Sequence, residues 1–192
     1  MDLCHDRCIR QTVRRESRIT KEIVALAGKR GVGVEAELGE IGGVEEDVIV
    51  AEGKERTADV EQALAFCREV DLAVFAPAIG TAHGFYKREP TIAWNVLEAI
   101  SERSQTPLAL HGGTGLSDEI VQRCIHLGCA KINISTNLKH VFIDSFVDYH
   151  HEHPDEYEPL KPLAAQAAAL TALASEKIGQ FGGAGKARSV GT

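Results

Sequence analysis

The chain has 192 residues, of which 44% are hydrophobic and 26% are charged, with a formal net charge of −7 at pH 7. These values are typical of one globular domain, and the acidic balance argues against a nucleic-acid partner without excluding a phosphorylated substrate. No run approaches the roughly 18 apolar residues of a membrane helix, and the polar N-terminus does not resemble a signal peptide, so we expect a cytoplasmic protein without membrane contact. Five cysteines at irregular spacing are expected to be reduced thiols.

Short apolar runs alternate along the chain with segments of helical periodicity. This alternation is typical of parallel βαβ units, in which a helix returns the chain to the start of the next strand. We predict strands at residues 33–38, 72–79, 107–110 and 130–134. We predict helices at residues 18–29, 57–70, 91–102, 117–127, 137–150 and 164–180. The predicted fold class is α/β, with about four βα units, half of a barrel, followed by C-terminal helices.

The remaining segments are expected to be irregular. Residues 1–16 fit no regular pattern, residues 39–52 are glycine-rich and acidic as in a mobile loop, and residues 182–192 are expected to form a flexible tail. Ser117 is the expected N-cap of the helix that follows it. No linker divides the chain, so we predict a single domain over residues 1–192.

Polar side chains follow three successive predicted strands. His83, His111 and Asn133 each come after a short apolar run. Because the carboxyl ends of parallel barrel strands meet at one face, these residues are expected to be neighbours although they are far apart in the sequence. The sequence therefore predicts one polar pocket at that face.

Four motifs carry a resemblance to a known family. They are VEAELGEIGGVEED at 34–47, APAIGTAHGFYK at 76–87, LALHGGTGL at 108–116 and AKINISTNLK at 130–139. In this order they resemble the zinc-dependent class II ketose-bisphosphate aldolases, a family that includes fructose- and tagatose-bisphosphate aldolases. The resemblance extends from about residue 17 to residue 187 and implies a partial TIM (β/α)8 barrel. It also implies reversible cleavage of a ketose 1,6-bisphosphate to dihydroxyacetone phosphate and an aldehyde.

The resemblance implies a Zn²⁺ ion, which polarises the ketose carbonyl and stabilises the enediolate. Catalytic zinc usually has three protein ligands, and His83 and His111 match two of the family's three. Glu35 and Glu37 are two residues apart in one strand and point to the same side. Glu37 matches a metal contact of the family; alternatively, it is an interior carboxylate paired with a neighbouring lysine or arginine.

Glycine-rich strand ends suit phosphate binding, because backbone N–H groups can approach phosphate oxygens there. The residues that match the family's dihydroxyacetone-phosphate positions are Gly84, Gly112, Gly113, Thr114, Asn133, Ser135 and Thr136. Glu45 matches the lid glutamate that moves protons; otherwise it is a solvated loop charge. Lys87 either adds a positive charge to the pocket or is a surface lysine. Leu160 stands where family members often carry an arginine for the second phosphate, which leaves the preferred sugar open.

Members of the family have about four further βα units before the VEAELG segment, and a complete barrel typically needs roughly 250 residues. The first zinc histidine and the acid/base aspartate of the family are therefore expected to lie outside this sequence. One alternative function is a catalytically inactive half-barrel that binds a sugar phosphate or serves as an interaction subunit. Because four strands leave open sheet edges, we expect a homo-oligomer or a complementing N-terminal half as partner. A third possibility is a misassigned start codon or an interrupted gene.

Overall fold

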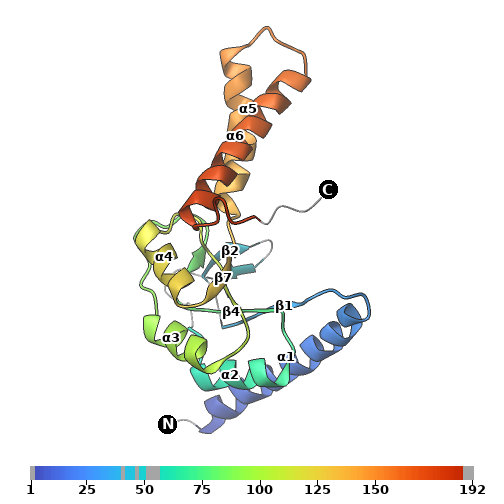
Figure 1. The fold of residues 1–192 in the computed structure, drawn as a ribbon, viewed down its shortest axis with the longest axis vertical. Helices are drawn as coiled ribbons and strands as arrows, with labels where there is room; N and C mark the ends of the chain where they lie inside the picture. Colours follow the sequence, from blue (N-terminus) through green and yellow to red (C-terminus); the bar gives the residue numbers. More distant parts are fainter. Residues whose placement is uncertain (1–2, 40–41, 46–47, 51–56, 188–192) are drawn as a thin grey trace.

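The structure, a computed structural model, describes residues 3–39, 42–45, 48–50 and 57–187, with side chains from residue 15 to 39 and from 57 to 187 (Figure 1). Its centre is a parallel four-stranded sheet in the order β1-β4-β6-β7. The strands are β1 (Glu35–Leu38), β4 (Val74–Pro77), β6 (Leu108–Leu110) and β7 (Cys129–Ile132). The helices between successive strands are α2 (Val60–Glu69), α3 (Trp94–Arg103) and α4 (Asp118–His126).

The predicted α/β class with four parallel strands is confirmed, because each strand pairs with the strand of the next βα unit in the sequence. Helix starts follow local chemistry. The Asp59 side chain accepts a hydrogen bond from the Gln62 N–H at 2.9 Å, and the Ser117 side chain accepts one from Ile120 at 3.4 Å, so Ser117 is the N-cap that the sequence predicts.

The core lies between the sheet and helices α2 to α4. Phe66 of α2 packs on Phe75 of β4 with ring centroids 6.0 Å apart, and both side chains are buried. Leu97 and Ile100 of α3 and Leu108 of β6 join the same cluster. The apolar runs of the sequence are therefore strands that are covered by helices, as expected for parallel βαβ units.

A second, smaller sheet corrects the predicted loop at 39–52. Its order is β3-β2-β5, with β2 (Gly42–Glu45), β3 (Val48–Val50) and β5 (Ala82–His83). The two glycines of β2 have no side chains that could show a strand period, so its identity comes from pairing with β5, in which Gly43 faces His83. His83 consequently lies in a short strand rather than in a loop.

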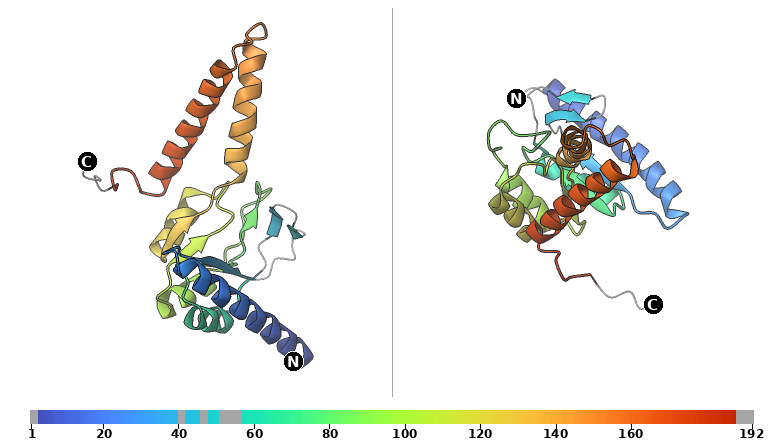
Figure 2. Two further views of the ribbon diagram at one scale, coloured as in Figure 1. Left: turned by 90° about the vertical axis from the view of Figure 1, so that its right-hand side faces the viewer. Right: turned by 90° about the horizontal axis from the view of Figure 1, so that it is seen from above.

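The two ends of the chain form long helices. α1 (Leu3–Gly28) starts far earlier than predicted and includes most of the segment that was expected to be irregular. α5 (Thr136–Glu152) and α6 (Leu160–Gln180) form a hairpin that projects from the sheet (Figures 1 and 2). The predicted tail at 182–192 lies only partly within the described residues.

Few side chains of the α5–α6 hairpin are buried. α5 contains no buried residue. A hollow of about 330 Å³ on it is lined by Phe142, Ile143, Phe146, Val147, Leu163 and Gln166. Among the helices of the described residues, none combines the length and apolar character needed to cross a membrane.

Candidate active site at the carboxyl ends of the strands

The polar residues predicted at the strand ends meet in the structure. His111 directly follows β6, and Asn133 directly follows β7. The N–H of Asn133 donates to the Leu110 carbonyl at 2.9 Å, and the N–H of Gly113 donates to the Asn133 carbonyl at 3.1 Å. The rings of His83 and His111 have centroids 6.1 Å apart. Two histidines and one asparagine from separate βα units are thereby brought to one face.

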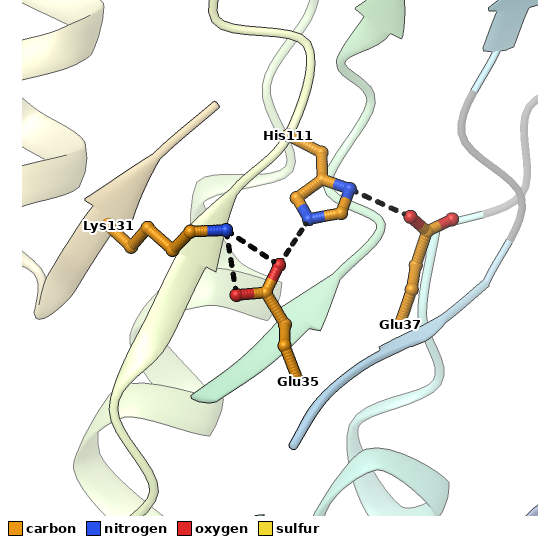
Figure 3. A network of polar contacts seen from close by, with 4 residues as sticks. All are labelled: Glu35, Glu37, His111 and Lys131. Atoms are coloured by element: carbon orange, nitrogen blue, oxygen red, sulfur yellow. Dashed lines mark hydrogen bonds and ion pairs between the residues drawn. The ribbon is translucent and has the colours of Figure 1, made fainter. Parts of the chain in front are cut away.

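His111 is the centre of a network of charged groups (Figure 3). Its Nε2 lies 2.9 Å from Glu35 Oε1, and its Nδ1 lies 2.9 Å from Glu37 Oε2. The Lys131 Nζ reaches the other Glu35 oxygen, Oε2, at 2.9 Å. The two glutamates lie on one side of β1, as their spacing predicts. With His111 protonated, the imidazolium and the lysine ammonium offset the charges of the two carboxylates.

The network shifts the pKa values of its members. The contact with Glu37 has the largest influence on the pKa of His111 and raises it; burial lowers this pKa, and the contact with Glu35 raises it further, so the net shift is upward. Burial raises the pKa of the Glu35 carboxyl, but the hydrogen bonds from His111 and Lys131 lower it by more. Both shifts favour an imidazolium held between two carboxylates.

The Glu35–Lys131 ion pair joins the two outermost strands of the sheet. Three strand spacings would separate β1 from β7 by roughly 14 Å in a flat sheet. The contact at 2.9 Å is made by two long side chains that reach toward each other across β4 and β6, the two strands that lie between β1 and β7. Such a contact is consistent with the inward curl of barrel strands, and it places the network on the inner face.

The side chains at this site are of the types that bind zinc, but they supply only part of a zinc site. Two imidazoles that share a tetrahedral ion at zinc–nitrogen distances of about 2 Å have centroids roughly 5 Å apart, close to the separation of His83 and His111. The Nδ1 of His111 is buried without a hydrogen-bond partner, because Glu37 is within ion-pair distance but not aligned for a hydrogen bond. Within the described part of the chain, however, no three His, Cys, Asp or Glu side chains are grouped to hold one ion. Zinc would also have to displace a proton from His111.

Gly112 and Gly113 lie tightly between two neighbouring segments. Gly112 has a φ of +67°, and a Cβ on it would stand 2.4 Å from the Ala82 carbonyl oxygen. A Cβ on Gly113 would stand 2.9 Å from the Asn133 carbonyl oxygen. Because the Gly113 N–H already donates to Asn133, this glycine serves first to bring the strand ends close together. The sequence alone indicates only that backbone N–H groups of these glycines could approach a phosphate.

The other predicted phosphate positions lie in the same loop, after β5 and at the start of α5. Thr114 is buried, and Gly84 has a φ of +110° with open space where a side chain would be. Ser135 precedes α5 without a capping hydrogen bond from its side chain, and Thr136 is the first residue of that helix. The N-terminus of α5, which favours anions, thus begins three residues after Asn133.

Glu45 is placed only by its backbone. It ends β2, two residues after Gly43, which pairs with His83. Its side chain lies outside the described residues, so its assignment as the lid glutamate stays a prediction.

Sequence reasoning missed two residues of the site. Lys131 contributes the cation that completes the network, and the signal for it was a lysine inside a strand that was expected to be apolar. Tyr86 connects the His83 and His111 segments through its hydroxyl. The signal for Tyr86 was a phenol three residues after His83, because a buried tyrosine hydroxyl usually has a hydrogen-bond partner.

A parallel β/α sheet with polar side chains gathered at the carboxyl ends of its strands is the arrangement of β/α-barrel enzymes. The chain has this arrangement over about half of a barrel. Residues 10–186 match the protein family described as fructose-bisphosphate aldolase class-II. The chain belongs to this family.

Named relatives show how much of the family's length is present. The chain is 39% identical over 170 residues to a sulfofructosephosphate aldolase of Alkalicoccus urumqiensis, covering 88% of this chain and 59% of the relative. It is 42% identical over 169 residues to a 6-phospho-5-dehydro-2-deoxy-D-gluconate aldolase of Shouchella clausii, covering 88% and 57%. The crystal structure of the YdjI aldolase from Escherichia coli K12 superposes with a TM-score of 0.74 at 32% identity, covering 92% of this chain and 59% of that one. The chain therefore spans a little under 60% of the length of these relatives.

Proposed function

We propose that the chain takes part in class II aldolase chemistry, the reversible cleavage of a ketose 1,6-bisphosphate, fructose or tagatose, to dihydroxyacetone phosphate and an aldehyde. The observation that carries this proposal is the meeting of His83, His111 and the Gly112–Gly113 loop at the carboxyl ends of the strands. Relatives at 39% to 42% identity have different aldolase names, including a fructose-bisphosphate aldolase of Geobacillus stearothermophilus.

In this proposal His83 and His111 hold a Zn²⁺ ion, with Glu37 as a further contact. Zinc in this position would polarise the ketose carbonyl. The protein orients His111 through the two carboxylates that face its ring nitrogens. When a histidine binds a metal, a carboxylate or carbonyl that accepts a hydrogen bond from its other ring nitrogen fixes the ring and raises its basicity. Glu35 would in this way keep His111 oriented toward the ion.

The phosphate is proposed to bind beside the first turn of α5. Ser135 and Thr136 offer hydroxyl groups there, and the unpaired N–H groups of a helix start attract anions. Gly84 and Thr114 are proposed to contribute to the same phosphate site, and Asn133 would hold the substrate oxygens. Glu45, on the strand that pairs with β5, is proposed to move a proton.

A second candidate function is an inactive half-barrel that binds a sugar phosphate or another polypeptide. Two observations favour it. Both ring nitrogens of His111 face carboxylates, and no three-ligand group occurs within residues 15–39 and 57–187. Among the described residues, β1 and β7 are the edge strands of the sheet, and these edges further support a homo-oligomer or a complementing N-terminal half as partner.

The deciding experiment has a binding arm and a turnover arm. Zinc affinity is measured by calorimetry for the wild type, His83→Ala and His111→Ala, with His126→Ala on the exposed end of α4 as matched control. Loss of binding in the first two variants alone supports the metal site, and equal retention in all three refutes it. Cleavage of fructose and tagatose 1,6-bisphosphates is then followed with and without a chelator. Chelator-sensitive turnover supports catalysis by this chain or its homo-oligomer, whereas zinc binding without turnover favours the second candidate.

A further inference from the structure

Two backbone segments that adjoin the candidate site are joined through a single hydroxyl group. The N–H of Ala82, the residue before His83, donates to the Tyr86 Oη at 3.0 Å. The same hydroxyl donates to the carbonyl of Gly112, the residue after His111, at 2.7 Å. Tyr86 therefore bridges the segment that carries one histidine and the segment that carries the other.

The two bridged backbones lie close together at Gly112. A Cβ on Gly112 would stand 2.4 Å from the oxygen and 2.9 Å from the carbonyl carbon of Ala82. The Tyr86 ring also lies beside Gly115, where a Cβ would be 3.7 Å from Cδ2. Glycines in the His111 loop thus make room for the Ala82 strand and for the ring whose hydroxyl connects the two.

The chemistry of a phenol suits this position. A tyrosine hydroxyl can accept one hydrogen bond and donate another at the same time, as the Ala82 N–H and the Gly112 carbonyl require. Burial raises the pKa of Tyr86 to about 12, so the hydroxyl keeps its proton and continues to donate. Phenylalanine would fill the same space and pack on the same core, but it would leave a backbone donor and a backbone acceptor without this partner.

We propose that Tyr86 is a positioning residue, whose hydroxyl fixes the spacing between the His83 strand and the His111 loop so that both imidazoles face a shared ligand. The inference rests on the proposed function for the identity of that ligand, Zn²⁺. The bridge itself is a property of the backbone. It can be tested whether or not zinc binds.

The test compares Tyr86→Phe with Tyr157→Phe, which removes the hydroxyl of a tyrosine that is 82% exposed. Hydrogen exchange is measured on peptides that include the Ala82 amide, and zinc affinity is measured on the same preparations. Tyr86→Phe should lose exchange protection at Ala82 and bind zinc about tenfold more weakly, the lower end of the effect of removing a residue that orients a metal ligand. Tyr157→Phe should match the wild type in both measurements.

A rescue variant separates positioning from packing. The amine of 4-aminophenylalanine in place of Tyr86 has an N–H that can donate to the Gly112 carbonyl and a nitrogen lone pair that can accept from the Ala82 N–H, more weakly than a hydroxyl oxygen does. It should therefore restore part of the protection and affinity that Tyr86→Phe loses. If Tyr86→Phe fails to fold, this variant is compared directly with the wild type and should keep part of the Ala82 protection and of the zinc affinity. Full loss of Ala82 protection and of zinc affinity in the 4-aminophenylalanine variant would refute the proposal.

The outcomes also distinguish this inference from the proposed function. Unchanged Ala82 exchange and unchanged zinc affinity in Tyr86→Phe would overturn the positioning role. If the wild type does not bind zinc, the proposed metal site fails, and the exchange measurement alone then decides whether the hydroxyl fixes the Ala82 segment. Loss of protection restored by the amine would still support the bridge in that case.

Discussion

Replacing Gly112 by alanine tests how closely the strand ends must approach. Gly112 has a φ of +67°, and Gly31, at the end of the α1 segment, has the same φ. A Cβ on Gly31 would meet nothing within 4 Å, whereas one on Gly112 would meet the Ala82 oxygen at 2.4 Å. Gly31→Ala is therefore a control with the same backbone strain and without the contact.

The expected cost has two parts. A residue with a Cβ in the left-handed region costs roughly 1–2 kcal/mol, and both variants bear this cost. Real Cβ atoms essentially never come within 3.0 Å of such an atom, so in Gly112→Ala one backbone segment must also move. Overpacking of this kind costs about 1–3 kcal/mol. Gly112→Ala should thus lose roughly 2–5 kcal/mol, a large part of the 5–15 kcal/mol by which domains are stable.

Urea unfolding followed by circular dichroism gives both free energies under the same conditions. The difference between the variants, about 1–3 kcal/mol, isolates the contact with Ala82, and in a chain of this size it corresponds to roughly 2–4 °C of melting temperature per kcal/mol. If Gly112→Ala costs no more than Gly31→Ala, the close approach of the two segments is not a feature of the protein in solution.

Three further predictions concern the charge network, the core and the oligomeric state. The contact with Glu37 raises the pKa of His111, so the stability that its imidazolium contributes should be complete below about pH 6.5 and be lost as the pH rises through the higher pKa of the folded state. Urea unfolding of the wild type and of His111→Gln across this pH range checks the prediction. A difference in unfolding free energy that does not change with pH would contradict it. Phe75→Ala, at a fully buried position, should cost about 3–5 kcal/mol by urea unfolding, whereas Phe85→Ala, 54% exposed, should cost far less; equal costs would show that Phe75 is not in the core. Light scattering should give a mass above the 20.7 kDa of one chain; a monodisperse monomer at all concentrations would rule out self-association.

The sheet could be predicted because its strands and helices are indicated by short stretches of the sequence. The two central strands β4 and β6 are short apolar runs with helical segments on either side, and a helix N-cap such as Ser117 is set by chemistry within one turn. The strand-end position of His111 and Asn133 follows from the same pattern, since parallel strands point one way. These features need no knowledge of which segments meet.

The features that escaped prediction depend on partners far along the chain. β2 begins with two glycines, which show no period of their own, and it is a strand because β5 lies beside it. Lys131 joins the network through Glu35, 96 residues earlier. Tyr86 bridges two backbones whose proximity only the folded structure shows. The start of α1 has no apolar stripe in its polar sequence, so it could not be distinguished from an irregular segment.

The Glu35–Lys131 contact also has a consequence for local unfolding. Neighbouring strands of the sheet belong to consecutive units, so an outer unit can open while the middle of the sheet persists. The charge network, in contrast, draws on β1 at one edge and on β7 at the other. Local unfolding of either edge strand would therefore break the contacts of this network. A ligand bound there would be held by both edges at once, and its binding free energy would oppose the opening of each. Ligand binding would thus stabilise both edge strands, β1 and β7, against local unfolding.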